Sequence, residues 1–140
     1  TERARALGKL LNVGLAIVDK RRPKPGQSQV MNVIGDVKDQ TCIIVDDIID
    51  SGGTIINAAK ALKNRGAKEV YVYITHGVLS GDAIKKIKSS VIKNLVITDT
   101  IDNGEKVKSA KNIEVLPISG LMGEAIKRIS NSTSVSDLFK

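Results

Sequence analysis

One stretch of the chain, residues 46–54, places glycines and hydroxyls between an apolar run and a segment with helical spacing. Gly52 and Gly53 allow the backbone to approach an anion closely. The N–H groups of such a loop, with the positive end of a helix that starts near Thr54, favour a phosphate. Ser51 and Thr54 add hydroxyl donors. This part of the stretch therefore predicts an anion site.

Two adjacent carboxylates, Asp46 and Asp47, open the same stretch. They would repel a phosphate, but they can accept hydrogen bonds from vicinal hydroxyls or hold a cation. A phosphate at one end and a diol at the other describe a ribose 5-phosphate unit. The alternative is an ordinary strand–turn–helix in which Asp50 or Ser51 is the N-cap residue.

Apolar periodicity predicts alternating helices and strands along the whole chain. The predicted helices cover 2–11, 54–65, 82–89 and 121–129. The predicted strands cover 13–18, 30–34, 41–45, 70–75, 95–98 and 113–118. Two loops are predicted, at 19–28 and 46–53. Such alternation is typical of an α/β fold with a mostly parallel central sheet flanked by helices on both faces. Ligands of these sheets bind at the carboxyl ends of the strands, where 46–53 is expected.

Composition narrows the class of protein. The 140 residues suit one domain, and 41% hydrophobic residues are enough for a core. The 22 basic and 15 acidic residues give a net charge of +7, which leaves a nucleic-acid ligand open, although 2% aromatic residues offer little base stacking. The single cysteine excludes an intramolecular disulfide. No apolar run approaches the ~20 residues of a membrane span and the start is no signal peptide, so we expect a cytoplasmic protein with no membrane and no nucleic-acid partner.

Four stretches resemble one family. Residues 46–54 resemble the phosphoribosyl diphosphate binding loop of the type I phosphoribosyltransferase fold. Residues 19–23 are similar to the flexible catalytic loop of the ribose-phosphate diphosphokinase family, which has this fold. Residues 75–81 and 134–139 resemble a following segment and the C-terminal signature of that family. The order and spacing of the four match over essentially the entire chain.

The resemblance implies an activity. The family transfers the diphosphoryl group of Mg-ATP to the C1 hydroxyl of ribose 5-phosphate, giving phosphoribosyl diphosphate and AMP for nucleotide biosynthesis. Mg²⁺ enters with ATP, and no residue of this chain is expected to be a metal ligand. By similarity, Asp46 and Asp47 hold the ribose hydroxyls. The residues expected to wrap the 5′-phosphate are Asp50, Ser51, Gly52, Gly53 and Thr54.

The same resemblance assigns roles outside this loop. Lys20 and Arg22 match catalytic residues that close over the transferring group, although taken alone they indicate a solvated basic loop. Ser134, Ser136 and Phe139 match positions of an allosteric anion and nucleotide site. The alternative for these three is a tail that docks with Leu138 and Phe139 and does nothing more.

The resemblance covers the C-terminal half of the family's chain. We therefore expect residues 1–140 to be a single phosphoribosyltransferase-like domain of a two-domain enzyme whose N-terminal half is absent. The fragment alone is expected to be inactive, and the intact enzyme to be a homo-oligomer. Two alternatives are a phosphoribosyltransferase, for which no base-binding segment is found, and a non-catalytic regulatory homologue, which would be expected to lose the acidic pair or the basic pair.

His76 and Cys42 each have a purely structural interpretation. His76 is predicted to be a structural histidine with a satisfied hydrogen bond. Cys42, in the middle of a predicted strand, is predicted to fill the core.

Overall fold

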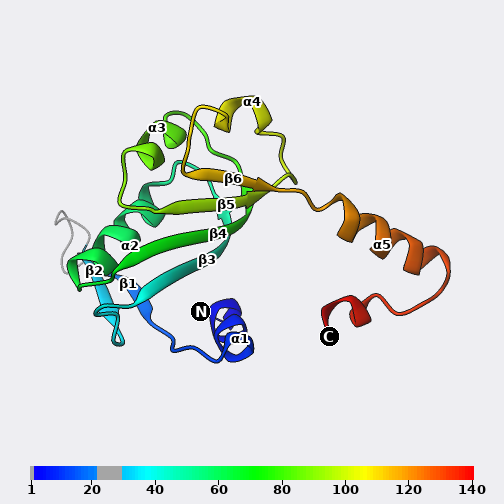
Figure 1. Ribbon diagram of the computed structural model, residues 1–140, viewed down its shortest axis with the longest axis horizontal. Coiled ribbons are helices and arrows are strands. Elements are labelled where there is room, and N and C mark those ends of the chain that lie inside the picture. Colours follow the sequence, from blue (N-terminus) through cyan, green and yellow to red (C-terminus); the bar gives the residue numbers. More distant parts are fainter. Residues whose placement is uncertain (1, 22–29) are drawn as a thin grey trace.

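Residues 2–21 and 30–140 are described by a computed structural model, which has one parallel sheet, one hairpin and flanking helices (Figure 1). The strands are β1 (Ile17–Arg21), β2 (Val30–Ile34), β3 (Thr41–Ile49), β4 (Glu69–Gly77), β5 (Asn94–Thr98) and β6 (Ile113–Leu116), and the helices are α1 (Glu2–Leu11), α2 (Gly53–Asn64), α3 (Ala83–Lys88), α4 (Gly104–Val107), α5 (Ser119–Ser130) and the 3₁₀ helix η1 (Ser136–Phe139). Across the described ranges, the helices lack the length and apolar character needed to cross a membrane.

The main sheet has the order β3-β4-β5-β6 with every pair parallel, which confirms the predicted α/β class. Each crossover steps to the next strand in the same direction, and such crossovers share one hand, so α2, α3 and α4 are placed on one face. In β4 the residues facing these helices, such as Val70 and Val72, are buried, whereas Tyr73 on the other face is exposed. Among the described residues, α1 lies near the other side, beside β3, so the sheet is flanked by helices as predicted (Figure 1).

A continuous apolar cluster fixes the helices to the sheet. Leu62 of α2, Ile87 of α3 and Leu95 and Ile97 of β5 are almost completely buried in it. Each such side chain contributes roughly 1.5–3 kcal/mol when it leaves water. The cluster therefore holds the start of α2 at a fixed place relative to the end of β3.

Strand β3 is longer than predicted. The sequence predicted 41–45, but the strand runs to Ile49, with Asp46 opposite Ile74 of β4 and Ile49 opposite Gly77. The carbonyl of Ile49 also accepts hydrogen bonds from the N–H groups of Val78 and Leu79. Pairing with the equally long β4 outweighs the turn preference of the two acids, so the acids lie inside the strand and the loop shrinks to residues 50–52.

The first hairpin also differs from the prediction. The strand predicted at 13–18 begins at Ile17 and continues to Arg21, into the predicted loop at 19–28. It pairs antiparallel with β2, which has the predicted bounds of 30–34, and Lys20 lies opposite Met31. Cross-strand pairing overrides the polar composition here, as is common for β-structure.

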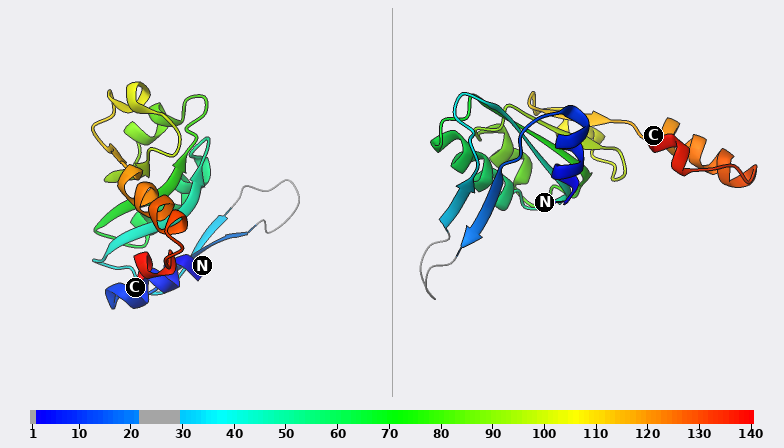
Figure 2. Two further views of the ribbon diagram at one scale, coloured as in Figure 1. Left: turned by 90° about the vertical axis from the view of Figure 1, so that its right-hand side faces the viewer. Right: turned by 90° about the horizontal axis from the view of Figure 1, so that it is seen from below.

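The C-terminal helix α5 buries no residue. Its apolar residues Leu121, Ile126 and Ile129 are 46%, 62% and 67% exposed. The helix extends beyond the end of β6 and away from the sheet, and the chain then turns back toward η1 (Figures 1 and 2). The sheet domain therefore forms without a contribution from α5 to its buried core.

Polar side chains tie together the carboxyl ends of β4 and β5. Asn103, 3% exposed, donates from Nδ2 to the carbonyls of Gly77 and Ile101, while its Oδ1 has no partner among the described residues. His76 Nδ1 lies 2.8 Å from Thr100 Oγ1. These contacts hold the segment before α4 against the end of β4.

Cys42 packs against the core from β3, where it is half-buried, which agrees with the predicted core-filling role. Burial raises the pKa of its thiol above the ordinary value.

Candidate functional site

A cavity of about 280 Å³ lies at the carboxyl end of β3. It is lined by the whole predicted phosphate-binding segment, residues 50–54, and by Asp46. Ile48, Ile49 and Ile55 form its apolar part. The structure therefore gathers the predicted phosphate-binding residues and one of the two predicted diol-binding acids around one space.

The start of α2 supplies unpaired N–H groups to this cavity. Gly52 is the N-cap residue, and its carbonyl accepts the first helical hydrogen bond, from the N–H of Ile56 at 2.9 Å. No side chain caps the helix, so the alternative in which Asp50 or Ser51 is the N-cap residue is wrong. The N–H groups of residues 53–55 have no acceptor within the helix, and the helix dipole adds partial positive charge at the same place. Both features suit a phosphate.

Glycine at position 52 is required by the shape of the loop. Gly52 has φ of 78°, in the left-handed region that other residues adopt at a cost of roughly 1–2 kcal/mol. A Cβ there would lie 3.6 Å from Ile56 Cδ1 and 3.8 Å from Ile87 Cδ1, which are ordinary contacts. The requirement therefore comes from the backbone conformation and not from crowding around Gly52.

Asp47 has a different environment from Asp46. Its Oδ2 lies 3.1 Å from Nη1 of Arg3 in α1, and its N–H donates to Asp46 Oδ1 at 2.9 Å. The hydrogen bond from Arg3 is the main reason why the pKa of Asp47 lies below its ordinary value of 3.8. Asp47 is not among the residues that line the cavity, so its role toward the ribose hydroxyls stays a prediction.

Sequence reasoning missed Arg3. It lies far from Asp47 in the chain, and a basic residue in an exposed helix gives no local signal of such a partner. Only the placement of α1 beside β3 brings the two side chains together.

Replacing Arg3 by methionine is expected to raise the pKa of Asp47 toward 3.8. The pair stabilises the ionised carboxylate, so its contribution to folding is present above pH 3.8 and is lost as the pH falls through the lower folded-state pKa. Carboxyl chemical shifts followed by NMR between pH 2 and 6 measure the midpoint directly. Arg5→Met, a matched change on the same helix, should leave it unchanged, and an unchanged midpoint in Arg3→Met would contradict the pairing.

Of the predicted catalytic pair, Lys20 is the residue that the structure describes. Lys20 lies on β1, is exposed, and does not line the cavity. Arg22 lies outside the described residues. The catalytic role of both residues stays a prediction.

The predicted allosteric residues lie in the C-terminal segment. Ser134 Oγ and Ser136 Oγ are 2.9 Å apart, and Arg128 of α5 donates to the carbonyl of Ser134 at 2.9 Å. Phe139 is 72% exposed. The tail contacts α5 through Arg128, and Leu138 is half-buried whereas Phe139 is exposed. The allosteric role stays a prediction.

His76 behaves as a structural histidine would, since its ring is hydrogen-bonded to Thr100. Within the described ranges, no three His, Cys, Asp or Glu side chains gather in a way that could hold a metal ion. At this end of the sheet, the uncapped start of α2 and the Asp46 carboxylate border the same cavity.

Comparisons with known proteins show the family to which the chain belongs. Residues 3–140 match the family described as the phosphoribosyl synthetase-associated domain. The chain is 59% identical over 138 residues to the ribose-phosphate pyrophosphokinase of Hyphomonas neptunium, which covers 98% of this chain and 44% of that relative. It is 60% identical over 137 residues to that of Bradyrhizobium diazoefficiens, with 98% and 43% covered.

A solved structure shows the same fold. The crystal structure of phosphoribosylpyrophosphate synthetase from Mycobacterium smegmatis superposes with a TM-score of 0.80 at 34% identity. The match covers 94% of this chain and 43% of that one. The chain thus spans less than half the length of the relatives that it matches.

Proposed function

Because the chain belongs to the phosphoribosyl synthetase-associated domain family, we propose that it provides the ribose 5-phosphate site of a ribose-phosphate pyrophosphokinase. The observation that carries the proposal is the cavity beside Asp46 and residues 50–54. Its uncapped helix start suits the 5′-phosphate, and the Asp46 carboxylate can accept hydrogen bonds from the ribose hydroxyls. The apolar residues that complete the cavity suit the faces of the sugar ring.

In the proposed reaction the C1 hydroxyl oxygen of ribose 5-phosphate attacks the β-phosphorus of ATP. The bond from that phosphorus to the oxygen bridging the α- and β-phosphates breaks, AMP leaves, and the hydroxyl proton passes to solvent. Mg²⁺, bound to ATP, neutralises charge on the phosphates. The cavity residues bind and orient the acceptor, while Lys20 and Arg22 stabilise charge on the transferring group. Catalysis of this kind depends on positioning and electrostatics.

We further propose that the chain, which spans 44% of the Hyphomonas protein, corresponds to the C-terminal half of its relatives, because residues 134–139 resemble the C-terminal signature of the family. The remaining half would then supply contacts to ATP, and this part alone would not turn over. A cytoplasmic homo-oligomer with an allosteric site at Ser134, Ser136 and Phe139 is the corresponding proposal for the intact protein. The support for the C-terminal half and for the allosteric site is the resemblance of residues 134–139 to the C-terminal signature of the family.

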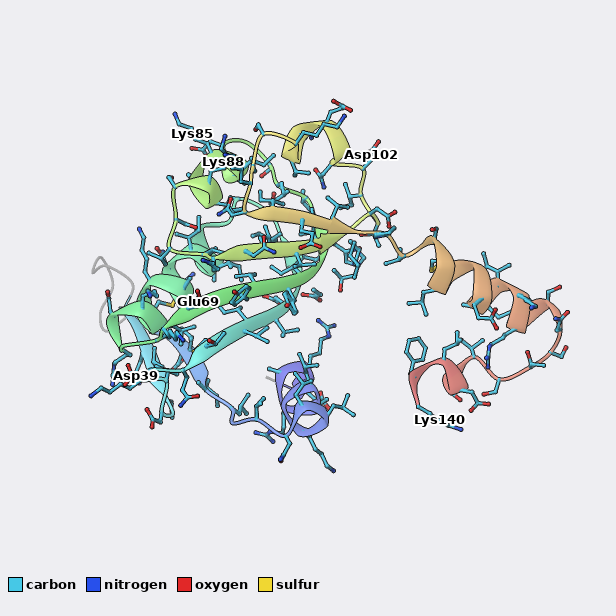
Figure 3. All side chains as sticks on the ribbon, in the orientation of Figure 1. Asp39, Glu69, Lys85, Lys88, Asp102 and Lys140 are labelled. Atoms are coloured by element: carbon cyan, nitrogen blue, oxygen red, sulfur yellow. The ribbon has the colours of Figure 1, made fainter. Side chains whose placement is uncertain are left out.

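Titration of the chain with ribose 5-phosphate by isothermal calorimetry tests the site. Asp46→Asn is expected to weaken binding by about ten- to a hundredfold, because hydrogen bonds to a charged group contribute roughly 1.5–3 kcal/mol. Asp39→Asn is the matched control. It makes the same chemical change just before β3 begins, at the opposite end of that strand (Figure 3).

The same titration on the full-length protein distinguishes the possible failures. Binding that Asp46→Asn and Asp39→Asn weaken equally would contradict the assigned site. Full-length protein that neither binds ribose 5-phosphate nor forms AMP from ATP in its presence would contradict the proposed function.

A further inference from the structure

A second cavity, of about 700 Å³, lies over α3 and the segment around α4. Its volume is within the range of small-molecule sites, roughly 300–1,000 Å³. None of its lining residues lines the cavity beside Asp46. Figure 3 labels two of its lysines, Lys85 and Lys88, on α3, on the side of the fold where α4 also lies.

The charge of this cavity is strongly positive. Lys85 and Lys88 reach it from α3, and Lys106 reaches it from α4. None of the three forms an ion pair in the part of the chain that the structure describes, whereas the neighbouring lysines do: Lys86 pairs with Asp82 at 2.7 Å, and Lys108 pairs with Glu105.

Asp82 is the acidic residue among those lining this space. The hydrogen bond from Lys86 is the main reason why its pKa lies below the ordinary value, and Lys85 acts in the same direction. Its negative charge is therefore already compensated by Lys86. The positive charges of Lys85, Lys88 and Lys106 have no such partner among the described residues and can attract an anion.

Lysines at the end of a helix also have a simpler explanation, because they interact favourably with the helix dipole. That explanation covers Lys85 and Lys88, which lie in the last turns of α3. Lys106 lies in the last turn of α4, so the same effect acts there, but the dipole of one helix does not account for the lining of one space by lysines of two helices. The lining of one cavity by lysines of two helices is the feature that a ligand would explain.

The other lining side chains narrow the chemistry of the ligand. The hydroxyl proton of Ser89 is used on the carbonyls of Lys85 and Lys86, so Ser89 offers only its oxygen lone pairs. Ser80 and Ser109 form no such bond among the described residues and can donate to an anion. Leu79 and Ile84 make the wall partly apolar, which suits an organic group beside the charge.

We propose that this cavity, with Lys85, Lys88 and Lys106 around it, binds a small organic molecule that carries two or more phosphate groups, at a site separate from the one beside Asp46. Three ammonium groups against one compensated carboxylate match more negative charge than a single phosphate carries. The helix that carries Lys85 and Lys88 lies next to the loop at residues 50–52, because Ile87 Cδ1 would be 3.8 Å from a Cβ at position 52.

Inorganic pyrophosphate is the first probe, titrated into the ¹⁵N-labelled chain and followed by amide chemical shifts. Saturable shifts are expected at residues 80–89 and 106–109. The triple variant Lys85→Ala, Lys88→Ala, Lys106→Ala is expected to weaken this binding at least about tenfold. The control triple variant Lys9→Ala, Lys60→Ala, Lys111→Ala removes the same charge from other exposed positions and should change the affinity less than about twofold.

The titration is repeated with saturating ribose 5-phosphate, so that any pyrophosphate bound beside Asp46 is displaced. Shifts confined to residues 50–55 would overturn the proposal, as would equal weakening in the two triple variants, which would indicate unspecific attraction. Far-UV circular dichroism of both variants checks that the fold is retained, which is expected because all six lysines are exposed. A nucleoside triphosphate that binds more tightly than pyrophosphate would support the apolar wall as part of the site.

Discussion

Replacing Lys20 by alanine in the full-length protein is expected to lower kcat by about 10²–10³, which corresponds to roughly 2.7–4 kcal/mol. The lysine is proposed to act on charge that develops on the transferring diphosphoryl group, so kcat and kcat/KM should fall together while the affinity for ribose 5-phosphate stays the same. Rates of AMP formation measured over a range of both substrates separate these quantities.

The position of Lys20 makes this a demanding test. It is exposed on β1 and does not line the cavity in this structure, so a large effect requires that another part of the intact enzyme bring the substrates to it. Lys60→Ala, on the exposed side of α2, is the control and should leave kcat unchanged. A loss below about tenfold in Lys20→Ala would contradict the catalytic assignment.

Replacing Asn103 by alanine is expected to lower the free energy of unfolding by about 1–3 kcal/mol. The change removes the donor that satisfies the buried carbonyl of Gly77, and burying an unpaired acceptor carries that cost. Urea unfolding followed by far-UV circular dichroism gives the value.

Two further variants sharpen this result. Asn103→Asp keeps the size of the side chain but places an acceptor against the carbonyl of Gly77, so its cost should be at least as large. Asn57→Ala, on an exposed position of α2, should be neutral or slightly stabilising, since alanine favours the helix. Equal stabilities of Asn103→Ala and the parent chain would show that this tie does not hold α4 to β4.

The class of fold could be predicted because its signal is repeated along the chain. Strands such as β4 and β5 alternate between a buried and an open face, and α2 shows helical spacing of its apolar residues. The ends of the strands were less predictable where pairing with a neighbouring strand determined them. Asp46 and Asp47 look like loop residues locally, yet they belong to β3 because β4 continues beside them.

The candidate site was predictable to the extent that it is continuous in sequence. Residues 50–54 and Asp46 line one cavity, as the pattern indicated. Contacts from distant segments carried no such signal: Arg3 reaches Asp47 from the first helix, and Asn103 reaches Gly77 from the segment before α4. The same is true of the second cavity, whose lysines looked like scattered solvent-exposed charges until α3 and α4 were placed side by side.

The order of the main sheet, β3-β4-β5-β6, has a consequence for how the chain acquires its structure. Each strand adds to an edge that the preceding unit has already formed, so no pairing has to wait for a distant later segment. Closing short loops costs less entropy than closing long ones, and topologies rich in local contacts fold fast. The sheet can therefore form in the order in which the ribosome releases the chain. The loop at residues 50–52 takes its shape early, once β4 has paired with β3 and α2 has formed between them.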